Sequence, residues 1–262
     1  MNIVVCIKQV PYATEVRLDP KTHTLVREGV QSIINPYDMY AIEEGIRLKE
    51  RYGGKVTVLT MGPPQAESAL REAVSYGVDE AVLLSDRAFA GADTLATTYT
   101  LALAVKKINK VDLVICGKQA ADGDTGQVGP GLAVRLDIPY VTYTRKIREI
   151  TNNVMRVERI MDDGYDVLEV LLPALLTVVK EINEPRVPSL KHKMRSQKQS
   201  IVVWNASDLG ADMGQLGLSG SATQVTRVFK PERNKKLQWL EGSVSEQVDA
   251  LIDKLRVIKV VA

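Results

Sequence analysis

The stretch that decides the fold is Val111-Asp112-Leu113-Val114-Ile115-Cys116-Gly117-Lys118-Gln119-Ala120-Ala121-Asp122-Gly123-Asp124-Thr125-Gly126-Gln127-Val128-Gly129-Pro130. Its first part is apolar and predicts a buried strand, and its second part is polar and glycine-rich and leads into a helix. Glycines at the carboxyl end of a strand let the backbone approach a ligand, and the free N–H groups of the next helix's first turn attract an anion. We therefore expect a nucleotide at this junction.

The same alternation of a buried strand and a helix precedes this stretch. Short continuous apolar runs rich in β-branched residues are typical of central parallel strands, and Asn-Pro and Gly-Pro-Pro sequences are typical of helix starts. Four such strands predict an α/β fold with a doubly wound, mostly parallel sheet. The predicted strands span residues 2–8, 56–61, 81–84 and 111–116, and the predicted helices span about 36–52, 63–76 and 94–108.

The place of the ligand follows from this sheet. In doubly wound sheets a ligand binds beyond the carboxyl ends of the strands, where the connections diverge to opposite faces. The loops after the first, second and fourth predicted strands are therefore expected to share one site. They span residues 8–11, 61–64 and 117–130.

The composition argues against several classes of function. The chain has 262 residues, with 45% hydrophobic and 25% charged, and its formal net charge of +2 argues against nucleic acid as the main partner. Its longest apolar run, 170–179, is interrupted by Pro173 and is about half as long as a membrane span of ~20 residues, so we interpret it as a buried strand pair or corner. The amino terminus lacks the layout of a secretion signal, which favours a cytoplasmic protein.

Residues that commonly bind metals are sparse. Cys6 and Cys116 each end an apolar strand and form no Cys-x-x-Cys pair, so we expect free buried thiols. His23 and His192 lie in polar segments without a third ligand nearby. The sequence therefore predicts no metal site.

The pattern changes after Pro139. Runs rich in β-forming residues are separated by short turn sequences, which predicts an antiparallel extension of the sheet. The predicted strands span 140–150, 154–161 and 165–172, and an additional small hairpin is predicted at 16–29.

The last part of the chain has too little apolar periodicity to fold alone. We interpret it as an extended arm that needs another surface, ending in a helix that Ser243 and Glu246 cap. The predicted division is an α/β nucleotide-binding domain at 1–185 and an extended carboxyl-terminal arm with a terminal helix at 186–262. Such an arm predicts a protein partner.

Five short motifs follow one another along the chain. They are Val5-Cys6-Ile7-Lys8-Gln9-Val10-Pro11, Asn35-Pro36-Tyr37-Asp38, Met61-Gly62-Pro63-Pro64, the stretch from Gly117 to Pro130, and Asn183-Glu184-Pro185-Arg186. In this order and spacing they resemble the beta subunit of electron-transfer flavoproteins. The resemblance covers nearly the whole chain. It implies a sheet of the adenine-nucleotide-binding (alpha-hydrolase-like) type and an arm that embraces an alpha subunit in a heterodimer.

The resemblance implies one of two ligands. In one class of these beta subunits the site holds AMP as a structural element. In the other it holds FAD, which receives a hydride from NADH and sends the two electrons along separate routes, a process called electron bifurcation. The segment Gly91-Ala92-Asp93-Thr94-Leu95-Ala96-Thr97 resembles the second class, because hydroxyls and N–H groups at a helix start suit a second phosphate. From composition alone, Asp93 and Thr94 would simply cap the helix. We expect FAD, with AMP as the alternative.

The expected roles of the site residues follow from their chemistry. Backbone N–H groups from Gly123 to Val128, with the side chains of Thr125 and Gln127, are expected to hold one phosphate. Asp93, Thr94 and Thr97 are expected to hold the other. Asp122 or Asp124 would repel phosphate, so one of them is expected to accept a ribose hydroxyl or to fix the loop. No catalytic residue is expected, because a flavin performs the redox chemistry itself. The expected cofactor-binding residues are Cys6, Lys8, Asn35, Tyr37, Asp38, Met61, Gly62, Asp93, Thr94, Thr97, Gly117, Gln119, Asp122, Gly123, Asp124, Thr125, Gly126, Gln127, Val128 and Gly129.

The resemblance also implies redox partners. Leu190 matches the exposed anchor with which the family docks a flavin dehydrogenase, such as an acyl-CoA or 2-hydroxy acid dehydrogenase, and Lys191 and Lys193 lie beside it. An exposed leucine flanked by charge suits a transient, electrostatically steered contact. Ferredoxin or flavodoxin is the implied low-potential acceptor. Two departures from the family pattern, Tyr12 and Val134, alter either the flavin surroundings or the partner surface.

Two other classes of function remain as alternatives. Enzymes that adenylate a substrate share this fold, but they usually carry a serine- and glycine-rich loop after the first strand, where this chain reads Lys8-Gln9-Val10-Pro11-Tyr12-Ala13. The other alternative is a nucleotide-sensing structural protein without redox activity. Counting the bound FAD and AMP discriminates among these possibilities.

Overall fold

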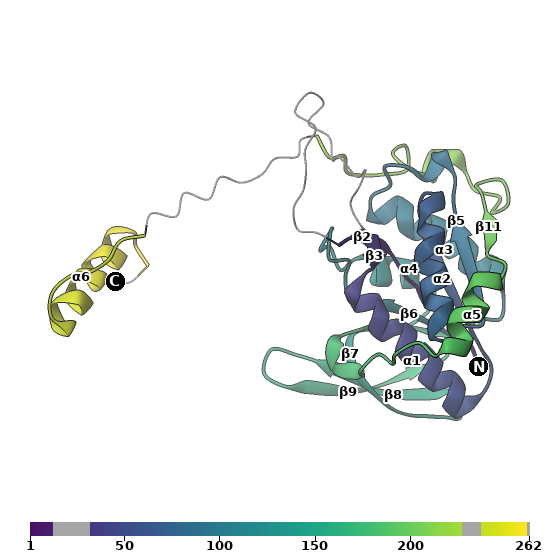
Figure 1. Cartoon of the computed structure of the whole chain (residues 1–262), viewed down its shortest axis with the longest axis horizontal. Helices are drawn as coiled ribbons and strands as arrows, with labels where there is room; N and C mark the ends of the chain where they lie inside the picture. The colour runs from purple at the N-terminus through teal and green to yellow at the C-terminus, as the bar shows by residue number, and fades with distance from the viewer. Residues whose placement is uncertain (13–31, 227–236, 261–262) are drawn as a thin grey trace. The chain divides into compact units, whose positions relative to one another are not determined.

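The computed structural model describes residues 1–12, 32–226 and 237–260 (Figure 1). The hairpin predicted at 16–29 lies outside these residues. The chain divides into two compact units, Met1–Arg227 and Val228–Ala262. The first unit contains the sheet with the helices that cover it, and the second contains the terminal helix.

The described part of the first unit is built on a nine-stranded sheet, in the order β11-β5-β4-β1-β6-β10-β7-β8-β9. The strands from β11 to β7 pair in parallel, whereas β7, β8 and β9 pair antiparallel. The predicted α/β class and mostly parallel sheet with an antiparallel extension are therefore confirmed. The strands are β1 (Asn2–Cys6), β4 (Lys55–Met61), β5 (Glu80–Leu84), β6 (Leu113–Gly117), β7 (Tyr140–Thr151), β8 (Val154–Ile160), β9 (Tyr165–Leu171), β10 (Ala174–Val178) and β11 (Val202–Trp204).

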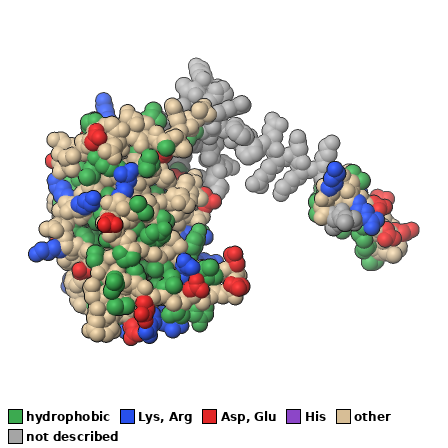
Figure 2. Space-filling model, turned by 180° about the vertical axis from the view of Figure 1, so that it is seen from behind, with side chains coloured by type: hydrophobic (Ala, Val, Ile, Leu, Met, Phe, Trp, Pro, Cys, Tyr) green, Lys and Arg blue, Asp and Glu red, His purple; other side chains and the backbone are tan. Residues whose placement is uncertain are grey.

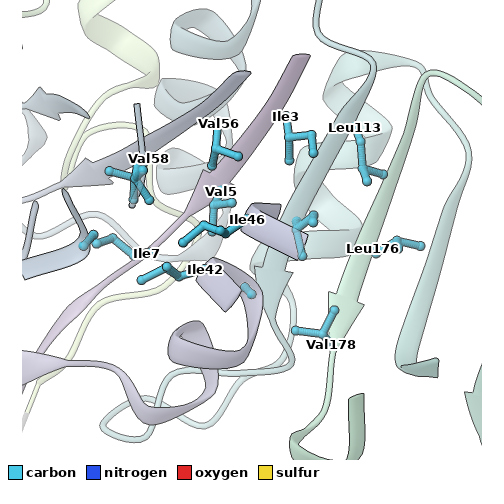
Figure 3. Packing of buried hydrophobic residues seen from close by; sticks show 14 of the residues in the cluster. Ile3, Val5, Ile7, Ile42, Ile46, Val56, Val58, Leu113, Leu176 and Val178 are labelled. Atoms are coloured by element: carbon cyan, nitrogen blue, oxygen red, sulfur yellow. The ribbon is translucent and has the colours of Figure 1, made fainter. Parts of the chain in front are cut away.

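Helices cover both faces of this sheet. They are α1 (Pro36–Tyr52), α2 (Glu67–Tyr76), α3 (Thr94–Ile108), α4 (Val128–Leu136) and α5 (Leu190–Lys198). Because side chains alternate along a strand, Ile3 and Val5 of β1 face the apolar cluster under α1 and α2, whereas Cys6 faces the cluster under α3 and α4. Figure 3 shows Val5 of β1 beside Ile46 of α1. Removing this apolar surface from water is the main favourable contribution to folding.

The helix starts show how the sequence signals work locally. Pro36 begins α1 and Gly53, with a φ of 72°, ends it, as predicted. The second helix differs from the prediction, because Pro64–Ala66 form a separate 3-10 turn before α2 begins at Glu67. Proline is tolerated at the start of this turn, because the first N–H groups of a helix have no acceptor within the helix and the N–H that proline lacks is not needed.

The apolar run at 170–179 forms a corner, as the sequence predicted. Its first residues end β9, a cis Leu172–Pro173 bond follows, and Ala174–Val178 form β10. All residues of β10 are buried, because this strand lies between β6 and β7 in the sheet. Such a central strand is apolar on both faces, which explains the continuous run.

The region after residue 186 differs from the predicted extended arm. Residues 190–198 form α5, which packs against α2, and Val202–Trp204 add β11 to the sheet edge next to β5. Polar bonds hold α5: Arg71 Nη1 donates to the O of Ser196 at 2.9 Å, and Gln199 Nε2 donates to the O of Asp79 at 2.7 Å. The apolar pattern missed α5 because polar side chains carry much of its attachment.

The second unit contains α6 (Val244–Val257). Ser243 and Glu246 form the predicted capping box, in which Ser243 Oγ accepts the N–H of Glu246 and the Glu246 carboxylate accepts the N–H of Ser243. Val244, Val248 and Leu251 are 78, 48 and 47% exposed. No residue of this helix is buried among the described residues, so its apolar stripe is exposed within the second unit. Across the described residues, no helix is both long and apolar enough to cross a membrane.

Candidate functional site

The candidate site lies at the carboxyl edge of the sheet, between β1 and β6. From β1 the chain winds through β4 to β5 on one side, and it then returns to β6 on the other side of β1. The connections that leave β1 and β6 therefore diverge, which is where ligands bind in such sheets. A hollow lined by Asn2, Lys55 and Lys110 lies at the opposite edge, beside the carboxyl end of α3, where the helix dipole disfavours phosphate.

Asn35 joins the start of α1 to the glycine-rich loop, residues 117–127. Its buried side chain donates from Nδ2 to the O of Gln119 at 2.9 Å and accepts the N–H of Ala121 on Oδ1 at 2.9 Å. Its backbone N–H donates to the O of Lys8 at 2.8 Å, next to the pairing of β2 (Gln9–Pro11) with β3 (Ser32–Ile34). Asn35 therefore makes no side-chain cap on α1 and instead holds the loop.

Lys8 reaches the same loop through its side chain. Its Nζ lies 2.6 and 2.7 Å from the two carboxylate oxygens of Asp122. Both side chains are partly exposed, so the ion pair is weak and a phosphate can compete for the ammonium. The pair also gives the acidic Asp122 a structural role in the glycine-rich loop, because its carboxylate neutralises Lys8.

Asp38 is a buried carboxylate beneath the site. One oxygen accepts the N–H of Lys8 at 2.7 Å, and the other accepts the N–H of Gly117 at 3.2 Å. Burial raises the pKa of Asp38 to about 7, although hydrogen bonds from Asn35, Lys8 and Gly117 act in the opposite direction. A Cβ on Gly117 would lie 2.3 Å from Asp38 Oδ1, so glycine is needed here to admit this carboxylate.

The start of α4 is open to an anion. The preceding residue, Gln127, makes no side-chain cap, and no described residue accepts a hydrogen bond from the backbone N–H groups of residues 125–129. The loop reaches this point through left-handed backbone at Asp124 (φ 54°) and Gly126 (φ 64°), and Gln119 Nε2 donates to Asp124 Oδ1. A Cβ on Gly129 would lie 2.3 Å from Thr177 Cγ2, so glycine lets α4 pack on β10.

The start of α3 is already capped from within the chain. One oxygen of Asp93 accepts the N–H groups of Leu95 and Ala96 at 2.9 and 3.1 Å. The other accepts both the N–H and the hydroxyl of Thr223 at 2.9 and 3.0 Å. These bonds lower the pKa of Asp93 against the opposing effect of burial, which is the largest single influence. Thr94 and Thr97 follow on α3, and their hydroxyls bond to no described residue.

Other predicted residues lie around this centre. Cys6 and Cys116 are free, buried thiols that face each other as register partners of β1 and β6. A hydrogen bond with Cys6, together with burial, raises the pKa of Cys116. Met61 ends β4, and Gly62 donates its N–H to the O of Leu84 at 3.0 Å, which ties that loop to β5.

Lys118 makes two aromatic contacts that the sequence does not predict. Lys118 Nζ lies 5.4 Å from the ring centre of Tyr37 and 5.7 Å from that of Tyr143. Tyr143 has a φ of 53° and lies at an irregularity in the pairing of β7 with β10, where its N–H donates to Thr177 Oγ1 at 3.1 Å. Such irregularities re-aim a side chain, and no pattern in a single sequence marks them.

The residues predicted for docking lie on α5. Leu190 is 76% exposed, and Lys191 and Lys193 are also exposed. Arg195 Nη2 bonds to the O of Val78 and Asp79, which precede β5 at the amino edge of the sheet. The anchored end of α5 therefore lies at the edge opposite to the glycine-rich loop.

Comparisons with known proteins identify the family. The model of the electron transfer flavoprotein domain matches residues 22–209. The chain is 52% identical over 256 residues to the electron transfer flavoprotein subunit beta of Thermoanaerobacterium thermosaccharolyticum, covering 97% of this chain and 98% of that one. It is 50% identical over 258 residues to the caffeyl-CoA reductase-Etf complex subunit CarD of Acetobacterium woodii, covering 98% of both, and 46% identical to protein FixA of Bradyrhizobium diazoefficiens, covering 97 and 91%. The chain therefore belongs to the electron transfer flavoprotein family and is similar to its beta subunits over nearly the whole length.

Proposed function

We propose that this chain is the beta subunit of an electron-bifurcating electron transfer flavoprotein and binds FAD at the carboxyl edge of its sheet. When bound, this FAD would supply hydride acceptance from NADH and the division of the pair into single electrons. One would be for ferredoxin or flavodoxin, and the other, by way of the FAD of the alpha subunit, for a partner dehydrogenase. The observation that carries nucleotide binding is the uncapped start of α4 beside a loop that Asn35 and Lys8 already hold in place.

The chain's own residues fit a dinucleotide. Backbone N–H groups of residues 125–129 would hold one phosphate, and Lys8 would supply a nearby positive charge. The hydroxyls of Thr94 and Thr97 would bind the other phosphate, since α3 and α4 pack side by side and both begin at the carboxyl edge. When bound, the flavin would supply hydride acceptance and single-electron transfer, and the protein would supply its position and electrostatic surroundings.

Structural AMP is the second candidate, and one observation favours it. The carboxylate of Asp93 is occupied by four donors and brings negative charge to the start of α3, where the second phosphate of FAD is proposed to bind. AMP would need only the start of α4. The similarity to subunit CarD, whose name places it in a complex with a caffeyl-CoA reductase, supports the part of the proposal in which this chain works in a complex with a redox partner.

Cofactor counting tests the proposal. The chain is purified with its alpha subunit, the heterodimer is denatured, and the released FAD and AMP are counted. Two FAD and no AMP per heterodimer are expected. One FAD with one AMP would establish the second candidate, and no nucleotide on this chain would contradict both.

The partners form part of the same proposal. The apolar stripe of α6 is proposed to bind the alpha subunit, and Leu190 is proposed to anchor a flavin dehydrogenase, with Lys191 and Lys193 steering its approach. Val187 and Met194, which are 86 and 56% exposed, enlarge this apolar face. The free thiols of Cys6 and Cys116 agree with the proposed location in the reducing cytoplasm.

Removing the proposed anchor gives a separate test. Leu190→Ala should leave the FAD content unchanged and slow electron transfer to the dehydrogenase, because it removes an exposed contact that supports no part of the fold. Val225→Ala, another largely exposed apolar residue, is the control and should change neither quantity. Unchanged transfer in Leu190→Ala would remove the docking role.

A further inference from the structure

We propose that Asp38 is a positioning residue that couples the two walls of the nucleotide site, an inference that rests on the proposed function. The two walls are the chain that follows β1 and the chain that follows β6. The carboxylate of Asp38 joins them through bonds of 2.7 Å from the N–H of Lys8 and 3.2 Å from that of Gly117. Lys8 in turn holds Asp122, and Gly117 begins the glycine-rich loop. One buried side chain therefore sets the separation of the two segments that would enclose the ligand.

The geometry demands a carboxylate. Each oxygen faces a separate backbone donor, and an ionised carboxylate accepts on both oxygens without presenting a hydrogen of its own. The isosteric amide of Asn would turn an N–H₂ group toward one of these donors. Gly117 complements this arrangement, because a Cβ there would displace Asp38 Oδ1.

The two hydrogen bonds that Asp38 accepts depend on the protonation state of its carboxylate. The groups that face Asp38 are the Asn35 amide, the Lys8 ammonium and the Cys116 thiol. The thiol is hydrogen-bonded to that of Cys6, and the ammonium is paired with Asp122. Because burial raises the pKa of Asp38 to about 7, the carboxylate gains a proton in the neutral range. A protonated carboxyl group presents an O–H on one side, so one of the two backbone bonds is lost. Both hydrogen bonds, and therefore a fixed separation between the two walls, are expected above pH 7.

The first measurement needs no ligand. In the amide NMR spectrum of the full chain, the N–H signals of Lys8 and Gly117 should shift together between pH 5.5 and 8.5, with a common midpoint about 7. In Asp38→Asn both titrations should disappear. Signals that do not titrate together in the wild-type chain would overturn the proposal.

The second measurement is FAD affinity of the heterodimer between pH 6 and 8. Asp38→Asn should weaken FAD binding about tenfold at pH 8, as expected for a buried donor left without its acceptor. Wild-type affinity should rise through pH 7, whereas that of Asp38→Asn should stay flat. The matched control is Asp112→Asn, because Asp112 accepts the N–H of Asn2 at 2.7 Å at the opposite end of β1. It should keep both the affinity and the pH profile of the wild type.

The outcomes separate the two claims. If the wild-type heterodimer binds FAD and Asp38→Asn binds it equally well with the same pH profile, the role of Asp38 is overturned and the proposed function stands. If the wild type binds neither FAD nor AMP, the proposed function fails and the coupling fails with it. If Asp38→Asn does not fold, the wild-type amide titration decides the question without a variant, because the N–H signals of Lys8 and Gly117 must titrate together if Asp38 joins them.

Discussion

At the scale of single residues, Asn35 shows how one side chain can hold a whole loop. Both ends of its buried amide bond to backbone groups of residues 119 and 121. Asn35→Ala would leave a buried donor and acceptor without partners, so we expect a loss of roughly 1–3 kcal/mol in the free energy of unfolding and a lower nucleotide content. Urea unfolding measures the first quantity and cofactor extraction the second.

A matched control separates this effect from the loss of any asparagine. Asn2 makes one exposed side-chain bond of 3.0 Å to the O of Lys110, at the other edge of the sheet. Asn2→Ala should change stability by only a few tenths of a kcal/mol and leave nucleotide content unchanged. Equal effects of the two substitutions would contradict the bridging role of Asn35.

Asp38 gives stability a dependence on pH. Its pKa of about 7 in the folded chain lies above the ordinary value of 3.8, so the folded state binds the proton more tightly. The free energy of unfolding, measured relative to Asp38→Asn, should therefore fall as pH rises from about 4 to 7 and stay level above that, by roughly 4 kcal/mol at most. Urea unfolding of both proteins across this range checks it. A difference that rises with pH would mean that the hydrogen bonds to the ionised carboxylate outweigh the cost of burying it.

At the scale of helices, the starts of α3 and α4 at the carboxyl edge differ in whether a side chain of this protein caps them. The difference allows the effect of a cap to be tested apart from the effect of a ligand. Asp93 caps α3 and also holds Thr223, whereas α4 has no side-chain cap. Asp93→Ala should lower the free energy of unfolding by about 1–2 kcal/mol, because it removes the cap. Asp93→Asn should retain most of that stability, since Asn is an equally good cap.

The same pair of variants tests where the second phosphate lies. If Thr94 and Thr97 hold that phosphate, the negative charge of Asp93 opposes binding, and Asp93→Asn should bind FAD at least as tightly as the wild type. AMP binding should not change. A clear loss of FAD affinity in this stably folded variant would show that the carboxylate itself contacts the cofactor.

These helices also show what a sequence can predict. Strands such as β1 and β6 and helix starts such as Asn35-Pro36 leave strong local signals, so the sheet and the position of the glycine-rich loop at its carboxyl edge could be predicted. The ligand at this edge stays a prediction. The hydrogen-bond partners of Asn35 and Asp38 could not be predicted. Asn and Asp occur both where a ligand is bound and where a buried side chain bonds to the backbone, so the residue type does not distinguish the two roles. The sequence does not predict α5, because polar bonds and not an apolar pattern attach it. It does not predict the contact between Tyr143 and Lys118 either, because that contact depends on an irregularity in strand pairing.

At the scale of the whole molecule, the two units differ in what stabilises them. The buried apolar clusters lie in residues 3–216 of the described chain, on both faces of the sheet. Figure 2 shows hydrophobic side chains among scattered charges on the back of the first unit. In the second unit no residue of α6 is buried, although its apolar stripe has the spacing of a helix that packs on something. The first unit therefore carries its own core, whereas the described residues of the second unit, 237–260, form none.

This difference predicts how the chain responds to truncation and to its partner. Removing residues 228–262 should leave the melting temperature of the first unit within a few degrees of the full chain, because no buried apolar cluster is lost. A helix of 14 residues with no core is marginal in water, so α6 should exchange its amide hydrogens quickly in the chain alone and slowly in the heterodimer. Ser243→Ala should not alter the slow exchange, whereas Leu251→Asp should abolish it by placing a charge on the apolar stripe. If α6 is equally protected without the alpha subunit, its stripe has a partner within the chain itself, and the proposed role of α6 in assembling the heterodimer is wrong.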